Sequence, residues 1–185
     1  MRKDFGKKTW FYPMPVLMIG TYDNSDKANV MNAAWGGVYD QNHVILCLNE
    51  NHKTTKNIKE KKAFTISFAD APHTAACDYV GVVSANDEPD KLQKAGFTTT
   101  KSAFVDAPII CELPMALECK LVKINEDGNV IGEIVNVSAD ESVLDENGLI
   151  NSSKLQVISY DGVHNDYLKL GEKTGSAFEA GNIFK

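Results

Sequence analysis

The order of hydrophobic and polar residues predicts a chain made largely of short strands. Residues 16–22 and 44–48 are apolar runs of strand length, and residues 63–68 alternate between apolar and hydroxyl side chains. The unbroken run at 44–48 predicts burial on both faces, whereas the alternation at 63–68 predicts a half-buried strand. The predicted strands are 16–22, 29–35, 44–48, 63–68, 117–121, 130–137 and 155–160.

Three helices are predicted between these strands. Thr54 or Thr55 is placed to cap the first helix, and a second is expected over 70–80. A third, over 87–95, would end at Gly96, in the position after a helix that favours glycine. Since the elements lack a β-α-β rhythm, the pattern favours a mainly β fold, a closed antiparallel barrel with inserted helices. We expect one domain over residues 1–185.

The stretch at 29–37, Asn-Val-Met-Asn-Ala-Ala-Trp-Gly-Gly, has an unusual composition for a strand. Its small side chains would let a flat ligand lie against the main chain, whose N–H and C=O groups could then contact the edge of the ligand. The alternative is a buried strand with a bulge at the two glycines.

The loop after residues 44–48 combines features of a phosphate site. A helix that begins near Thr54 would present unpaired N–H groups and the positive end of its dipole. Lys53, Thr55 and Asn57 would add a cation, a hydroxyl and an amide. We therefore consider a phosphomonoester site here, against the alternative of an ordinary capped surface helix.

Composition and charge narrow the function classes. A hydrophobic fraction of 43% and a charged fraction of 24% are ordinary for a soluble globular protein. The net charge of −6 argues against a nucleic-acid partner, because nucleic-acid phosphates would be repelled. No secretory signal precedes Pro13, and the longest apolar run is too short to cross a bilayer. We expect a cytoplasmic protein without membrane contact.

No sequence pattern predicts a metal site or a conventional catalytic site. Cys47, Cys77, Cys111 and Cys119 form no Cys-x-x-Cys pair, and the histidines show no ligand spacing with them. Cys77 is the best candidate for a reactive thiol, with inert burial as the commoner alternative. Dinucleotide, P-loop and nucleophile-elbow motifs are absent.

Several motifs, taken in order, resemble one known family. The segments at 13–22, 29–35 and 52–58 are similar to the flavin reductase-like, flavoredoxin-type FMN-binding split-barrel family. Asp78-Tyr-Val-Gly, Asp90-Lys, Ala95-Gly and Tyr167-Leu-Lys-Leu-Gly-Glu extend the resemblance over nearly the whole chain. Each motif is weak alone, but the ordered set is fairly specific.

The resemblance implies a split barrel and a set of FMN-binding residues. The stretch from Asn29 to Trp35 would line the isoalloxazine, a basic loop would hold the phosphate, and Lys91 would supply a cation, from either subunit. Tyr160 is a candidate for ring stacking, with a core aromatic as the alternative. Ala33 departs from the family pattern, which often has a hydroxyl residue there. The implied residues are Asn29, Asn32, Ala33, Ala34, Trp35, Asn49, His52, Lys53, Thr54, Thr55, Asn57, Lys91 and Tyr160.

The resemblance also implies a redox function and an assembly. We expect an FMN-binding oxidoreductase or electron-transfer flavoprotein, which passes a hydride or electrons from NAD(P)H or a protein donor to an acceptor. FMN rather than FAD is the expected cofactor, and a homodimer with flavin at the subunit interface is the expected assembly. No side chain is assigned a catalytic role, because the hydride chemistry belongs to the flavin. The alternatives are a non-enzymatic flavin-binding protein and an interaction barrel without a cofactor.

Overall fold

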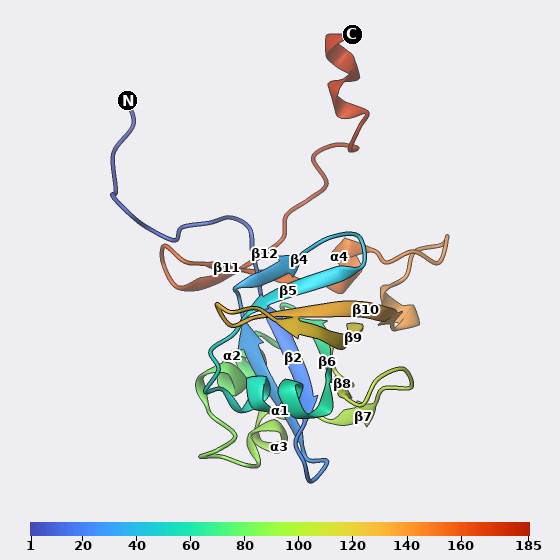
Figure 1. Cartoon of the computed structure of the whole chain (residues 1–185). Coiled ribbons are helices and arrows are strands. Elements are labelled where there is room, and N and C mark those ends of the chain that lie inside the picture. The colour runs from blue at the N-terminus through green and yellow to red at the C-terminus, as the bar shows by residue number, and fades with distance from the viewer.

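A curled, seven-stranded antiparallel sheet forms the centre of the molecule (Figure 1). The computed structural model describes residues 1–185. The strands in spatial order are β3 (Ala28–Ala33), β2 (Leu17–Tyr22), β6 (Ala63–Phe68), β9 (Met115–Ile124), β10 (Asn129–Ala139), β5 (His43–Cys47) and β4 (Gly36–Val38). The prediction of a mainly β fold with inserted helices is therefore confirmed, and the predicted strands at 117–121 and 130–137 pair as the β9–β10 hairpin.

The sheet curls because its two edges are joined by a very short connection. The edge strands β3 and β4 are separated by only Ala34 and Trp35 in the sequence. These two residues carry the chain from one edge of the sheet to the other, so the edges must meet there. A Cβ on Gly36 would lie 2.8 Å from Leu46 Cδ2 and 2.9 Å from Leu17 Cδ1, which explains the glycine. The two glycines begin β4 and pair with β5 in regular register, so they form no bulge.

Two hydrophobic clusters lie on the two faces of β2. Leu17 and Ile19 belong to the cluster inside the curled sheet, together with Phe64. Val16 and Met18 belong to a second cluster, which lies under the helices α2 and α3. Side chains alternate along a strand, so one apolar strand can serve two cores at once.

The helices and the remaining strands surround this sheet (Figure 1). A second sheet has the order β1 (Met14–Pro15), β11 (Ile158–Asp161) and β12 (Asp166–Lys169), and β7 (Thr99–Lys101) pairs with β8 (Pro108–Ile110). The helices are α1 (Lys53–Lys61), α2 (Thr74–Val82), α3 (Lys91–Ala95) and α4 (Ser152–Leu155), with 3-10 turns η1 (Glu141–Val143) and η2 (Ala180–Phe184). None of these helices combines the length and the apolar character that a membrane-spanning helix needs.

Two predictions about strand burial were wrong. β6 is buried on both faces, because β8 covers its hydroxyl side and Thr65 donates a hydrogen bond to the Pro108 carbonyl. β5 has the alternating pattern instead, and Cys47 is exposed on its outer face. Sequence alternation alone does not reveal which outer face another hairpin will cover.

The helix ends also differ from the predicted ones. His52 occupies the N-cap position of α1 without a side-chain bond, so neither Thr54 nor Thr55 caps this helix. α3 begins only at Lys91, although Gly96 does end it with a positive φ of 79°. Leu155, the predicted first residue of the last strand, instead ends the short helix α4, and β11 begins at Ile158.

Candidate functional site

Two adjoining cavities form one groove between the corner of the sheet and helix α2. The apolar cavity, of about 310 Å³, is lined by Met31, Asn32, Ala33, Ala34, Trp35, Cys47, Leu48, His52, Asp78, Gly81, Val82, Tyr160 and Tyr167. The polar cavity, of about 350 Å³, is lined by Asn29, Met31, Asn32, Asn51, His52, Lys53, Thr54, Gly81, Val82, Val83, Ser84, Ala85, Asn86 and Lys91. Five residues line both cavities, so the two are continuous.

Small residues shape the apolar cavity. Ala33 and Ala34 form part of its wall at the corner where the two sheet edges meet. On the opposite side, a Cβ on Gly81 would lie only 2.6 Å from Asn32 Cβ, so glycine lets α2 approach β3 closely. Trp35 is 52% exposed and stands at the mouth of the cavity. A flat ring could therefore rest against main chain between aromatic walls.

The first turn of α1 lines the polar cavity. No side chain caps this helix, and the N–H groups of a first turn have no partner inside the helix. The buried Thr54 is fixed because its Oγ1 accepts a 2.8 Å hydrogen bond from Asn29 Nδ2. The Thr54 hydroxyl proton thus remains free to donate to a ligand. Uncapped amides, a dipole end and a hydroxyl are together the chemistry that suits an anion.

Lys53 brings a positive charge to the polar cavity, but it shares this charge with Asp23. The Lys53 Nζ atom lies 3.0 Å from Asp23 Oδ2. Burial raises the pKa of Asp23, but hydrogen bonds from Ser25, Lys53 and the Lys27 amide outweigh it and hold that pKa well below its usual value. The carboxylate therefore positions the Lys53 ammonium and partly neutralises it.

Lys91 is a buried cation in the wall of the polar cavity. It is 3% exposed, and its Nζ donates to the carbonyls of Val80 at 2.7 Å and Val83 at 2.8 Å. Burial, followed by the nearby charge of Lys53, lowers the pKa of Lys91 to about 8. Two of the three ammonium protons therefore bind the end of α2, and one remains for a ligand.

The structure brings ten of the thirteen predicted site residues into the groove. The three exceptions are Asn49, Thr55 and Asn57. Thr55 donates its hydroxyl to the Asn49 carbonyl, which braces the loop before α1. Asn57 donates to Thr21 Oγ1 and so ties α1 to β2. These three residues support the walls of the groove without lining it.

Sequence reasoning did not assign Asp78, Gly81 and Tyr167 to the site. Tyr167, on β12, donates a 2.7 Å hydrogen bond to Asp78 Oδ1 inside the apolar cavity. Burial and then this bond raise the pKa of Tyr167 to about 12. The only sequence signal was that both segments carried part of the family resemblance.

The cysteines divide into exposed and buried ones. Cys77 is buried, and burial raises its pKa to about 12, so the thiol stays protonated and unreactive. Burial also raises the pKa of Cys119 to about 12. Cys47 is exposed and lines the apolar cavity, which the predicted burial of both faces of residues 44–48 did not anticipate.

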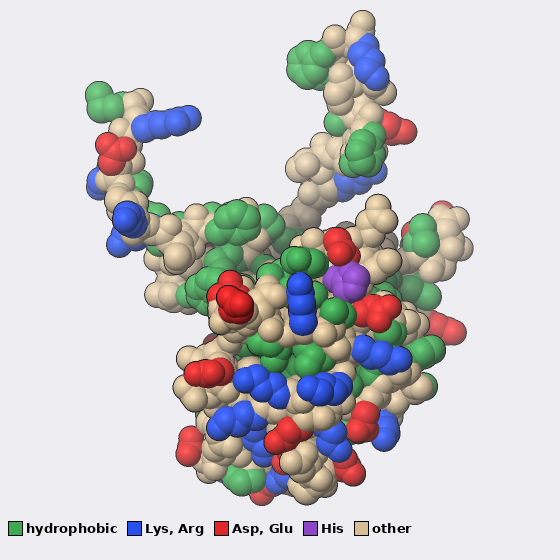
Figure 2. Space-filling view, in the orientation of Figure 1, with side chains coloured by type: hydrophobic (Ala, Val, Ile, Leu, Met, Phe, Trp, Pro, Cys, Tyr) green, Lys and Arg blue, Asp and Glu red, His purple; other side chains and the backbone are tan.

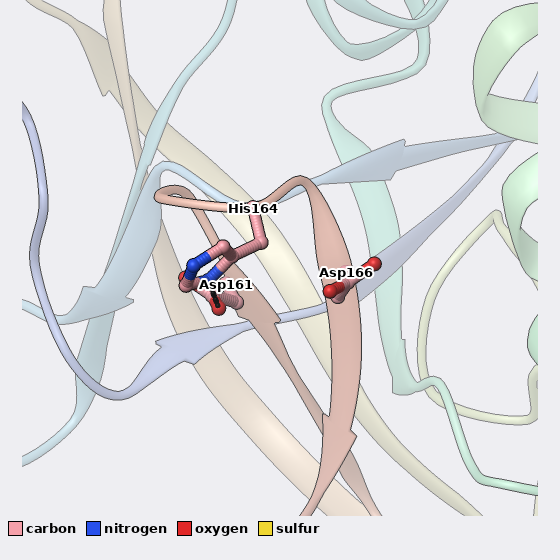
Figure 3. Close-up of side chains that lie close together, drawn as sticks. All are labelled: Asp161, His164 and Asp166. Atoms are coloured by element: carbon pink, nitrogen blue, oxygen red, sulfur yellow. Dashed lines mark hydrogen bonds and ion pairs between the residues drawn. The ribbon is translucent and has the colours of Figure 1, made fainter.

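Outside the groove, a group of polar side chains lies at the turn between β11 and β12 (Figure 3). Asp161 accepts hydrogen bonds from Tyr12, from the Val163 amide and from His164 Nδ1 at 2.8 Å. Asp166 contributes a third potential metal-binding atom within 4.8 Å of the others. These bonds anchor the N-terminal segment and the turn, so we assign a structural role to the group.

The residues of the groove fit a phosphorylated, ring-containing ligand. The polar cavity offers helix amides, a hydroxyl and two lysines, which suit a phosphomonoester. The apolar cavity offers alanines, a glycine and three aromatic residues, which suit a flat heterocycle. FMN carries both chemical features, with its phosphate at one end and its ring at the other.

Comparisons with known proteins agree with this geometry. The family model of the flavin reductase like domain matches residues 9–159. Flavoredoxin of Desulfovibrio vulgaris (Miyazaki F) is similar with a TM-score of 0.95 and 36% identity, over 98% of this chain and 100% of that one. Flavoredoxin from Methanosarcina acetivorans gives a TM-score of 0.89 and 26% identity over 100% of both chains.

A more distant structure shares the fold. An FMN-binding domain of a flavin reductase-like enzyme from Shewanella baltica has a TM-score of 0.77 and 22% identity, over 88% of each chain. The seven-stranded curled sheet is therefore the sheet of the FMN-binding split barrels. With the family match, this supports a flavin-associated redox role. This chain belongs to the flavin reductase-like family.

Proposed function

We propose that this protein binds FMN along the groove and acts as an oxidoreductase or electron carrier. One observation carries the proposal, namely that an apolar cavity bounded by small residues runs directly into a cationic cavity at the start of α1. This order of apolar and cationic walls matches the order of ring and phosphate in FMN. FMN-binding relatives of the same fold support FMN over FAD.

The polar cavity would hold the phosphate. The first-turn amides of α1 and the Thr54 hydroxyl would donate hydrogen bonds to it, while Lys53 and Lys91 would balance its charge. Asn29 would keep the Thr54 hydroxyl turned toward the ligand. Each group is fixed by protein contacts before a ligand arrives, which reduces the cost of ordering on binding.

The apolar cavity would hold the ring. Ala33 and Ala34 would leave main-chain groups open to the ring edge, and Ala33 provides no hydroxyl for it. Trp35 and Tyr160 would flank the ring. FMN, when bound, supplies the hydride and electron chemistry, so the chain needs only to orient the ring and leave one face accessible.

A nicotinamide or a protein is proposed as the electron donor. Steady-state oxidation of NADH and NADPH with added FMN distinguishes an NAD(P)H:FMN oxidoreductase from a flavin-binding protein without turnover. Turnover with either nicotinamide supports the enzyme, and flavin binding without turnover supports a protein donor or a binding role.

We also propose a homodimer. Both terminal segments extend away from the sheet and carry exposed apolar side chains, among them Phe5, Phe11, Phe178 and Phe184 (Figure 2). A further cavity, of about 580 Å³, lies between the N-terminal segment and β4. Exposed apolar surface of this kind is typical of association sites. Light scattering after size exclusion should give twice the chain mass of 20.3 kDa.

One experiment tests the cofactor assignment. The purified protein should bind FMN with quenching of flavin fluorescence, and riboflavin should bind more weakly because it lacks the phosphate. A protein that stays colourless and leaves the fluorescence of added FMN unchanged would be an interaction barrel without a cofactor.

A further inference from the structure

Asp78 is the only carboxylate that lines the apolar cavity. It lies on α2, one turn before Gly81, which also lines this cavity. No lysine, arginine or histidine lies within ion-pair distance of it, and its side-chain hydrogen bond comes from Tyr167. A part-buried carboxylate with one neutral donor keeps most of its charge effective in its surroundings.

Tyr167 holds this carboxylate in place. Its phenol donates to Asp78 Oδ1 at 2.7 Å, and its ring centroid lies 6.2 Å from that of Tyr160. Tyr160 donates its own hydroxyl to Asn165 Oδ1, so it does not compete for Asp78. The raised pKa of Tyr167 keeps the phenol protonated, and therefore a donor, over the working pH range.

The groove thus has opposite charges at its two ends. Lys53 and Lys91 line the polar cavity, and no lysine or arginine lines the apolar one. A ligand with an anionic tail would be oriented by this difference, with its ring beside Asp78. The orientation rests on the proposed function.

We infer that Asp78, positioned by Tyr167, lowers the reduction potential of a flavin bound in the groove. Reduction by two electrons, with uptake of one proton at neutral pH, leaves one negative charge on the flavin ring. A fixed carboxylate near that ring repels this charge and disfavours the reduced form relative to the oxidised form. The reduced flavin in this groove would therefore be a stronger reductant than the same flavin in a groove without the Asp78 charge.

A purely structural role for the pair predicts a different result. The Asp78–Tyr167 bond also joins α2 to β12, so losing either partner could loosen the groove. A looser groove would shift the midpoint potential of the bound flavin in the same direction in both variants. An electrostatic role predicts opposite directions, because Asp78→Asn removes the charge, whereas Tyr167→Phe keeps the charge and removes the donor that partly screens it.

The test measures binding of oxidised and reduced FMN to the full chain, together with the midpoint potential by equilibration with redox dyes. For Asp78→Asn we expect reduced FMN to bind about tenfold tighter relative to oxidised FMN, a rise of about 30 mV for a two-electron couple. Tyr167→Phe should lower the potential. Asp87→Asn, an equal charge change at an exposed residue outside the groove, should leave it at the wild-type value.

The outcomes separate this inference from the proposed function. If the wild type binds FMN but Asp78→Asn has the potential of Asp87→Asn, the inference fails and the proposed function stands. A midpoint potential that rises in both Asp78→Asn and Tyr167→Phe would also overturn the inference and would indicate a purely structural role for the pair. If Asp78→Asn does not fold, Tyr167→Phe decides alone, since only a lowered potential supports the inference. No FMN binding by the wild type would overturn both.

Discussion

The side-chain amide of Asn29 donates a 2.8 Å hydrogen bond to Thr54 Oγ1, and this bond joins the edge strand β3 to the first turn of α1. Both residues are buried, at 2% exposure each. The bond uses the Thr54 hydroxyl as an acceptor, so its proton is left for a ligand in the polar cavity that Thr54 lines. In the proposed complex, a strand and a helix from different parts of the chain would therefore bind the phosphate together.

Replacing Thr54 with valine should weaken FMN binding about tenfold, because a hydrogen bond to a charged phosphate is worth on the order of 1.5 kcal/mol. Riboflavin, which lacks the phosphate, should lose much less affinity. Fluorescence titration with both flavins measures the difference. Thr54→Ser keeps the hydroxyl and serves as the matched control. Equal losses for FMN and riboflavin would remove Thr54 from the phosphate site.

FMN affinity should fall as the pH rises above about 8. Burial lowers the pKa of Lys91 to about 8 in the free protein. A bound phosphate would favour the charged amine, so the complex holds this proton to higher pH than the free protein does. Binding is therefore strongest below the free-protein pKa and weakens above it. Titrations from pH 7 to 9.5 should show this fall for the wild type.

The control for this pH dependence is Lys91→Met. It should bind FMN more weakly at pH 7 and show a flatter profile above pH 8. Riboflavin should show no comparable fall with the wild type, since it lacks the phosphate. A wild-type profile that stays level to pH 9.5 would exclude Lys91 as a phosphate contact.

The sequence predicted the residues of two unusual local stretches better than it predicted the residues that distant packing brings into the groove. Residues 29–35 and 52–54 lie in two stretches whose composition is itself unusual, so local reasoning could identify them. Asp78 and Tyr167 are 89 positions apart and meet only in the fold. Nothing in either local stretch indicates that α2 and β12 wall the same cavity.

The errors in burial have a similar physical cause. Thr65 belongs to an alternating strand, a pattern that predicted one solvent-exposed face. The β7–β8 hairpin covers that face, and Thr65 donates its hydroxyl to the Pro108 carbonyl. Thr55 looked like a helix cap, but it donates to the Asn49 carbonyl. In both cases the hydroxyl finds a partner that distant packing provides, which a local pattern cannot reveal.

Tyr12→Phe should release the N-terminal segment from the β11–β12 turn. Tyr12 donates to Asp161, and this bond, followed by the one from His164, lowers the pKa of Asp161 to about 2. A lowered carboxyl pKa gives stability that is present above about pH 4, the unfolded value, and is lost as the pH falls toward 2. Acid should therefore release the wild-type segment as well.

Hydrogen exchange over residues 8–14 measures this release. The amides should exchange faster in Tyr12→Phe than in the wild type at pH 7, and the difference should shrink toward pH 2, after correction for intrinsic exchange rates. Phe11→Leu, an exposed neighbour without this bond, is the control. Unchanged protection in Tyr12→Phe would mean that packing of β1 on β11 holds the segment without the hydroxyl.

Gly81→Ala should destabilise the protein, although alanine favours a helix more than glycine does. The added Cβ would lie 2.6 Å from Asn32 Cβ, so α2 must move away from β3, at a cost of about 1–3 kcal/mol. Since Gly81 lines both cavities, the same movement should weaken FMN binding. Thermal unfolding and fluorescence titration test the two effects.

Gly37→Ala, whose Cβ would meet nothing within 4 Å, should change stability by no more than about 0.5 kcal/mol. A Gly81→Ala variant as stable as the wild type would show that α2 can shift freely, and the groove would then be wider than the close approach of α2 and β3 implies.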